Sequence, residues 1–132
     1  MGQLVSEALV AEIESAFNSR DVDRILEYFA DDGVFATARG PVKEGIELKG
    51  KKAIGDFLRE RFSYIPDMYW HPQYRFVSAC GQYGVSYWVV TGTNQRNGSK
   101  LELNGCDIFR FQNGKLIQKI PFGRRSSEVD KH

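Results

Sequence analysis

The chain has 132 residues and a mass of 15.0 kDa, the size of one domain built around one core, so we predict a single domain over residues 1–132. Hydrophobic residues make up 42% and charged residues 27%, the balance of an ordinary globular protein, which excludes disorder as the main state. Because 18 basic and 17 acidic side chains leave a net charge of only +1, the sequence predicts no nucleic-acid partner and no attraction to an anionic membrane.

The sequence also argues against membrane insertion, metal binding and thiol chemistry. No stretch approaches the roughly 20 apolar residues that span a bilayer, and the N-terminus lacks the pattern of a signal peptide, so we expect a soluble cytoplasmic protein. Cys80 and Cys106 are too few for a disulfide scaffold and are expected to be packed thiols. With only His71 and His132 beside them, no cluster has metal-ligand spacing, so neither a metal nor another cofactor is predicted.

Three helices are predicted in the first half of the chain. Apolar residues recur at i, i+4 spacing over 5–17, which indicates an amphipathic helix. A second helix is expected from a cap at Asp21 to Phe29, ending at 31–33. The third covers 54–62 and must end near Pro66.

Strands dominate the rest. Short strands are predicted at 34–38 and 46–48, around a turn at Gly40-Pro41. Residues 68–124 have the composition of four antiparallel strands, interrupted at Gly81, Asn97-Gly98 and Asn113-Gly114. Helices followed by a meander of long strands are typical of the α+β class, with the helices on one face of a curled antiparallel sheet. Residues 123–132 are polar and are read as a tail.

One acid breaks the apolar pattern of the long strands. If both Asn-Gly pairs form two-residue type I′ turns, Asp107 lies opposite Trp88 on one side and Ile120 on the other. Alternation then makes Asp107 the only ionisable group on the apolar face of its strand, which also carries Leu101, Leu103, Gly105, Phe109 and Phe111.

The position of this carboxylate predicts that it transfers protons. Removal from water costs several kcal/mol unless the group is paired, or else its pKa rises and it keeps its proton. We therefore expect Asp107 to titrate above an ordinary aspartate and to act as an acid or base. The structural alternative is that Asp107 accepts bonds from backbone amides or pairs with Arg39 or Arg75, and a bulge in either hairpin would turn it outward.

Several segments together resemble a known family. They are NSRD at 18–21, FADD at 29–32, GKKAI at 50–54, and GCDIFRF at 105–111 leading to NGK at 113–115. In this order they are similar to the NTF2-like superfamily, in particular the SnoaL-like proteins. The resemblance implies a cone-shaped α+β fold in which a curled sheet closes on three N-terminal helices around a deep pocket, usually in a homodimer.

The resemblance also implies roles for single residues. Polyketide cyclases of the superfamily use an acid on the penultimate strand as acid/base, and Asp107 matches that position. In ketosteroid isomerases the base and the oxyanion-hole tyrosine fall where this chain has Thr37 and Ile13, so that activity is not expected. Limonene-epoxide hydrolases need an Asp-Arg-Asp arrangement across the last three strands, and the positions of its members at 88–90 and 120–121 are apolar here, so that mechanism is not expected either.

Three functions therefore remain open. The first is a cyclase, dehydratase or isomerase that moves a proton on a carbonyl-bearing apolar substrate through Asp107. The second is a small-ligand-binding protein without chemistry, and the third is a dimeric interaction module. The sequence leaves the substrate undefined.

A pocket and a dimer interface complete the expectations. Asp107 is expected at the floor of a closed-ended hollow of roughly 300–1,000 Å³, which would bind an apolar small molecule. The residues expected to contact this small molecule are Phe35, Thr37, Trp70, Tyr74, Trp88, Phe109, Ile120 and Phe122. Inward positions of Trp70, Tyr74 and Phe76 are favoured over inward positions of His71 and Arg75. The outer face of the sheet, with Tyr87, Val89 and Ile108, is half apolar, and a second copy of the chain is expected to cover it.

Overall fold

The computed structural model describes residues 5–37 and 46–125. In chain order it contains α1 (Glu7–Ser19), α2 (Val22–Leu26), β1 (Phe29–Ala36), β2 (Glu47–Lys49), α3 (Lys51–Tyr64), β3 (Tyr69–Val77), β4 (Tyr83–Thr93), β5 (Lys100–Gln112) and β6 (Lys115–Arg125). The predicted turn at Gly40-Pro41, the side chain of Arg39 and the end of the polar tail lie outside the described residues.

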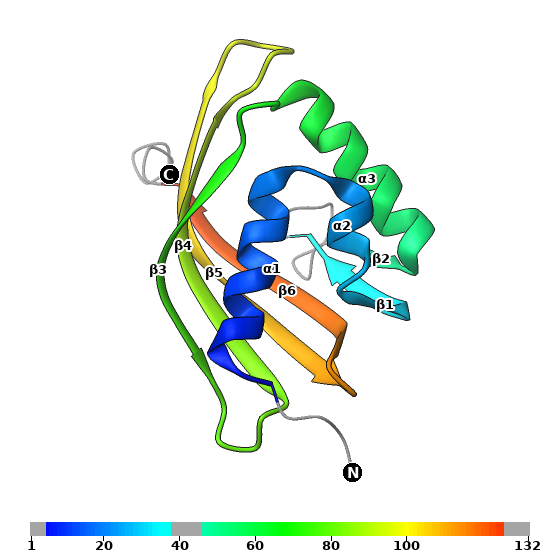
Figure 1. Ribbon diagram of the computed structural model, residues 1–132. Coiled ribbons are helices and arrows are strands. Elements are labelled where there is room, and N and C mark those ends of the chain that lie inside the picture. Colours follow the sequence, from blue (N-terminus) through cyan, green and yellow to red (C-terminus); the bar gives the residue numbers. More distant parts are fainter. Residues whose placement is uncertain (1–4, 38–45, 126–132) are drawn as a thin grey trace.

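The six strands form one sheet in the order β2-β1-β6-β5-β4-β3. The sheet curls around α1, and the three helices lie on its concave side (Figure 1). This is the expected α+β architecture of a curled sheet and three helices. One part of the expectation is wrong, because β1 and β6 pair in parallel. Such a pair needs a long crossover, and here most of the chain runs between the two strands.

The helices begin where side chains cap them. Ser6 Oγ accepts a bond from the Leu9 amide at 3.3 Å, and Asp21 Oδ1 accepts one from the Arg24 amide at 3.2 Å. Helix α2 is shorter than predicted, because the Tyr28 carbonyl accepts from the Leu116 amide at 2.8 Å and the chain has already joined the sheet.

One predicted hairpin turn is confirmed and the other is wrong. Asn113 and Gly114 both have positive φ, 54° and 78°, and Gln112 faces Lys115 as in a two-residue turn. The β4–β5 loop instead spans residues 94–99, closed by a 2.9 Å bond from the Asn94 amide to the Ser99 carbonyl. The register shifts by two residues, which keeps Asp107 on the inner face but places it opposite Ser86.

Two β-bulges decide which side chains face inward. Ile117 is the extra residue in β6, since Phe111 faces Leu116 whereas Arg110 faces Gln118. Because the extra residue is in β6, Asp107 stays inward while the remainder of β6 changes face. Gln73 is the extra residue in β3, between the Pro72–Trp88 and Tyr74–Tyr87 pairs.

The core lies between α1, α3 and the concave face of the sheet. Its largest fully buried side chains are Ile13, Ile25, Phe29, Ile54, Phe109 and Leu116. Among the described residues, no helix is both long and apolar enough to cross a membrane.

Candidate active site

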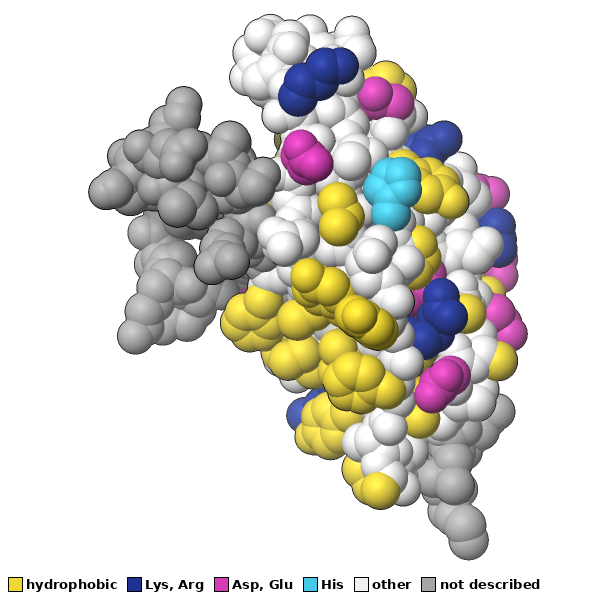
Figure 2. Space-filling view, turned by 90° about the vertical axis from the view of Figure 1, so that its left-hand side faces the viewer, with side chains coloured by type: hydrophobic (Ala, Val, Ile, Leu, Met, Phe, Trp, Pro, Cys, Tyr) yellow, Lys and Arg dark blue, Asp and Glu magenta, His cyan; other side chains and the backbone are white. Residues whose placement is uncertain are grey.

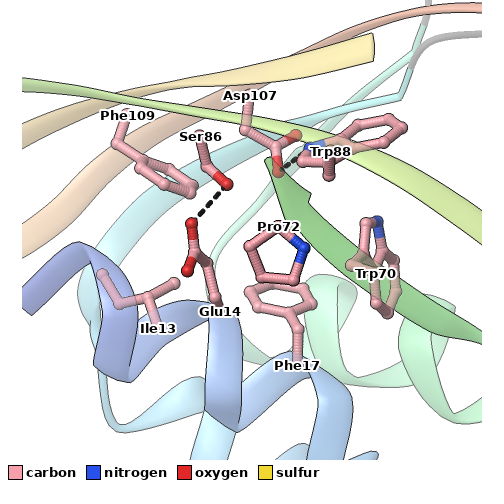
Figure 3. A pocket seen from close by; sticks show the side chains of 9 residues that line it. All are labelled: Ile13, Glu14, Phe17, Trp70, Pro72, Ser86, Trp88, Asp107 and Phe109. Carbon is pink, nitrogen blue, oxygen red and sulfur yellow. Dashed lines mark hydrogen bonds between the residues drawn. The ribbon is translucent and has the colours of Figure 1, made fainter. Parts of the chain in front are cut away.

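A small hollow lies between α1 and the sheet. Its walls are Ile13, Glu14 and Phe17 of α1, Trp70 and Pro72 of β3, Ser86 and Trp88 of β4, and Asp107 and Phe109 of β5 (Figure 3). Its volume is about 10 Å³, roughly the space of one water molecule. The prediction of a hollow of several hundred Å³ is therefore wrong. Buried aromatic side chains, chiefly Phe17, Trp88 and Phe109, fill most of the cone.

Asp107 is held by two donors from the neighbouring strands. Lys119 Nζ donates to Oδ1 at 3.0 Å and Trp88 Nε1 donates to Oδ2 at 2.9 Å. The side chains of Lys119 and Asp107 are only 5% and 7% exposed. The expectation of an unpaired acid is therefore wrong, because a buried ammonium neutralises the carboxylate.

Lys119 is the cation of this pair and is surrounded by aromatic rings. Its Nζ lies 4.3 Å from the ring centroid of Phe35 and 5.1 Å from that of Phe17. Cation–π attraction of this kind compensates part of the lost hydration of a buried ammonium. The Ile117 bulge is the reason that Lys119 faces inward at all, since it lies opposite Phe109 on the inner face.

A second polar cluster borders the same hollow. Arg75 donates to Glu14 Oε1 through Nε at 2.9 Å and through Nη2 at 2.7 Å, and Ser86 Oγ donates to Oε2 at 2.6 Å. Hydrogen bonds to Glu14 raise the pKa of the Arg75 guanidinium above its ordinary value. The predicted alternative in which Arg75 pairs with Asp107 is therefore wrong, because Arg75 is engaged by Glu14.

Four of the predicted residues line the hollow: Asp107, Trp70, Trp88 and Phe109. Two others, Phe35 and Thr37, lie outside the walls of the hollow. Phe35 is 6% exposed and packs behind Lys119. Thr37 follows the end of β1, where its Oγ1 accepts from the Ile46 amide at 3.1 Å.

The remaining three predicted residues, Tyr74, Ile120 and Phe122, do not face inward. Tyr74 is 70% exposed and Phe122 is 55% exposed. Ile120 and Phe122 face Ile108 and Cys106 on the outer side, because the Ile117 bulge reverses this part of β6.

The Gln73 bulge gives β3 a mixed orientation that neither predicted alternative contains. Trp70, before the bulge in the chain, faces inward, and so does Arg75, after the bulge. His71 is exposed on the outer side, where its Nε2 lies 3.0 Å from Thr91 Oγ1. Phe76 is also exposed, at 53%.

Sequence reasoning missed three polar residues of this region: Glu14, Ser86 and Lys119. A signal existed for Glu14, which stands four residues after Val10 and three before Phe17 and so falls on the buried stripe of its helix. Ser86 alternates with Trp88 on the inner face of β4. No sequence signal marks Lys119, because its orientation depends on the bulge.

The arrangement is suited to proton transfer and hydrogen bonding. Two carboxylates, a hydroxyl and the indole groups line an otherwise apolar hollow, and Arg75 and Lys119 pair with the carboxylates from outside its walls. Among the residues that the structure describes, no group of three or more His, Cys, Asp or Glu could hold a metal ion.

Comparison with known proteins identifies the family. Residues 10–119 match the model of the SnoaL-like domain, so the chain belongs to this family. No curated protein matches the sequence.

Solved structures of similar fold support the same architecture. They include Bal32a from a soil-derived mobile gene cassette (22% identity, TM-score 0.77, 94% of this chain and 92% of that chain covered) and a candidate polyketide cyclase from Xanthomonas campestris pv. campestris (21%, 0.79, 92% and 91%). SalBIII, an epoxide hydrolase/cyclase-like enzyme in pyran ring formation in the polyether salinomycin, is 20% identical with a TM-score of 0.76 over 89% and 88% of the two chains. At these identities the likeness establishes the NTF2-like fold.

Proposed function

We propose that this SnoaL-like protein is a cofactor-independent acid–base enzyme of the cyclase, dehydratase or isomerase type. Asp107 is the proton-transfer group, and the substrate is a small, mostly apolar carbonyl compound. The observation that carries the proposal is the buried Asp107 carboxylate on the wall of the hollow, oriented by Lys119 and Trp88. The cyclase and cyclase-like neighbours share this fold.

The two donors hold the Asp107 carboxylate in a fixed orientation. Each carboxylate oxygen keeps an acceptor site beyond the one that Lys119 or Trp88 uses. Asp107 takes a proton from the carbon next to the substrate carbonyl, and the electron pair moves onto the carbonyl oxygen. Return of the proton to the far carbon of a double bond conjugated with the enolate gives an isomer. Loss of a β-hydroxyl, which takes the proton from Asp107 and leaves as water, gives dehydration. Attack of the enolate carbon on a second carbonyl, whose oxygen takes that proton, closes a ring.

Substrate binding requires the hollow to widen. Its outer wall consists of Trp70, which is half-buried, and Pro72, which is exposed, both on β3. Among the described strands, β3 is at the edge of the sheet and pairs with β4 alone. Outward rotation of the Trp70 side chain would enlarge the hollow without breaking the hydrogen bonds of Asp107.

Proton exchange on model ketones tests the proposal. Cyclohexanone and 2-tetralone are incubated in D2O with the wild type, with Asp107→Asn and with Asp56→Asn, a matched control at an exposed salt bridge. We expect the wild type and the control to accelerate deuterium uptake beside the carbonyl by about 100-fold or more, and Asp107→Asn to lose the acceleration. Binding of both ketones without acceleration by the wild type would favour the non-catalytic ligand-binding protein.

The outer face of the sheet supports a second copy of the chain as the partner. Hydrophobic side chains gather there below the middle of the face (Figure 2). Exposed aromatic side chains on this face include Tyr74, Phe76, Tyr83 and Phe122, at 42–70%, and the ring of Tyr74 stacks on that of Tyr87 with centroids 5.8 Å apart. The helices cover the opposite face, so we propose a two-fold homodimer on this apolar sheet face.

The mass in solution tests this proposal. Light scattering at micromolar concentration is expected to give twice 15.0 kDa. If the protein dimerises but neither binds nor exchanges the ketones, the interaction module becomes the better description of its function.

A further inference from the structure

The hollow contains a second polar arm that the proposed proton transfer does not use. Glu14 reaches it from α1 and Ser86 from β4, joined by the 2.6 Å bond from Ser86 Oγ to Glu14 Oε2. In Figure 3 this bond lies beside the bond between Trp88 and Asp107, because Ser86 and Asp107 are directly opposite each other on β4 and β5. The hollow therefore carries two chemically distinct polar groups side by side, and the rest of its lining is apolar.

The acceptor inventory of Glu14 leaves room for a ligand. Both bonds from Arg75 end on Oε1, whereas Ser86 is the one donor to Oε2 among the residues that the structure describes. A carboxylate oxygen accepts about two hydrogen bonds, and a serine oxygen can accept as well as donate. The hydroxyl group of a ligand can donate to Glu14 Oε2 and accept from Ser86, once the Ser86 hydroxyl has rotated away from Glu14.

The charges around the hollow select an uncharged ligand. Glu14 is paired with Arg75 and Asp107 with Lys119, so the four groups sum to zero. An anionic ligand would meet two carboxylates whose cations are already engaged. A cationic ligand would have to compete with Arg75 or Lys119 for a carboxylate.

A purely structural role explains the buried Glu14 and Ser86 less well. Glu14 does link α1 to β3 and β4, but it is 8% exposed, and removing a carboxylate from water has a large free-energy cost. An apolar side chain at position 14 would continue the buried stripe of α1 between Val10 and Phe17. Hydrophobic replacement of buried ion pairs is often neutral or stabilising, so packing alone does not account for this acid.

We infer that Glu14 and Ser86 form the recognition site for a hydroxyl group of an uncharged apolar ligand that also contacts the neighbouring Asp107. This deepens the proposed function and rests on it for the chemistry at Asp107. The ligand class is an aromatic or alicyclic molecule that carries an alcohol.

A set of probes of equal size tests this inference. Benzyl alcohol and ethylbenzene differ in exchanging a hydroxyl for a methyl, and benzoate and benzylammonium add a negative or a positive charge. Binding is followed by NMR of the indole N–H groups of Trp70 and Trp88, the two tryptophans of the chain, both of which line the hollow. The variants are Glu14→Gln and Ser86→Ala, with Glu12→Gln as the matched control on the exposed side of α1.

In the wild type and in Glu12→Gln, benzyl alcohol is expected to bind about tenfold or more tightly than ethylbenzene, with no binding of benzoate. Glu14→Gln should bring the ratio close to one, and Ser86→Ala should lower it at least about threefold. A purely structural clamp would lower the melting temperature of Glu14→Gln and leave the ratio unchanged, which would overturn the inference. Equal wild-type affinity for alcohol and hydrocarbon, tighter binding of either charged probe, or no binding of benzyl alcohol would also overturn it.

The failure of this inference is distinguishable from that of the proposed function. Asp107→Asn should abolish ketone exchange and keep the preference for benzyl alcohol. Wild-type exchange without that preference refutes only the hydroxyl site. The preference without exchange refutes only the acid–base function.

Discussion

Lys119 Nζ lies 3.0 Å from Asp107 Oδ1, and both side chains are more than nine-tenths buried. The two residues are not directly opposite each other, since Asp107 faces Pro121 and Lys119 faces Phe109. They meet on the inner side because Ile117 bulges out of register and reverses the face of the residues that follow. One inserted residue in β6 thereby supplies the counter-ion of the candidate catalytic acid.

Replacement of Lys119 should therefore strongly lower the free energy of unfolding. Lys119→Met leaves Asp107 buried without a counter-charge, and we expect the free energy of unfolding to fall by about 3–5 kcal/mol. Urea unfolding followed by circular dichroism measures the change. The double variant Asp107→Asn/Lys119→Met should recover most of the loss, whereas Lys52→Met, at a side chain that is 90% exposed, should match the wild type. A small effect of Lys119→Met would show that water reaches the pair in solution.

Trp88 should stabilise Asp107 through a single hydrogen bond. Trp88→Phe removes the indole N–H and keeps an aromatic ring, so an acceptor of the buried carboxylate loses its donor. We expect a loss of about 1–3 kcal/mol in the free energy of unfolding and a large chemical-shift change at the Asp107 carboxyl carbon. The control is Trp70→Phe, since Trp70 forms its hydrogen bonds with Asn18 through the backbone. An unchanged Asp107 signal in Trp88→Phe would contradict this contact.

The proposed dimer should depend on the centre of the apolar sheet face. Ile108 lies on the outer side of β5 between Val85 of β4 and Ile120 of β6. Ile108→Lys places a charge there and should give a monomer by sedimentation equilibrium, because a buried unpaired ammonium opposes association. Glu102→Lys, on the same strand towards its other end, should remain dimeric. Equal masses of the two variants would argue against this face as the interface.

The two thiols should differ in reactivity. Hydrogen bonding by Ser78 lowers the pKa of Cys80, which is exposed, whereas burial and then the charge of Asp107 raise the pKa of Cys106. Because the thiolate is the reactive form, Cys80 should be alkylated by iodoacetamide before Cys106 throughout pH 7–9. Mass spectrometry of the peptides after partial labelling measures the order. Earlier labelling of Cys106 would be incompatible with its half-buried position beside Asp107.

The general architecture could be predicted because it depends on local patterns. Apolar residues at helical spacing correctly predicted α1 and α3. The Asn113-Gly114 turn correctly predicted the pairing of β5 with β6 next to the turn. Alternation along β5 correctly placed Asp107 on the inner face, and the Asn97-Gly98 error did not change this, because a shift of two residues preserves the face. The preference for the SnoaL-like family rested on segments spread over most of the chain.

The sequence by itself determined the fold class, the family and the inward position of Asp107. Only the tertiary structure decided what surrounds that acid. The bulges at Gln73 and Ile117 turned Arg75 and Lys119 into the fold and turned Tyr74, Ile120 and Phe122 out of it. A bulge of this kind has no signature in strand composition, since it arises where neighbouring strands of a curled sheet must stay in register while the core packs beneath them.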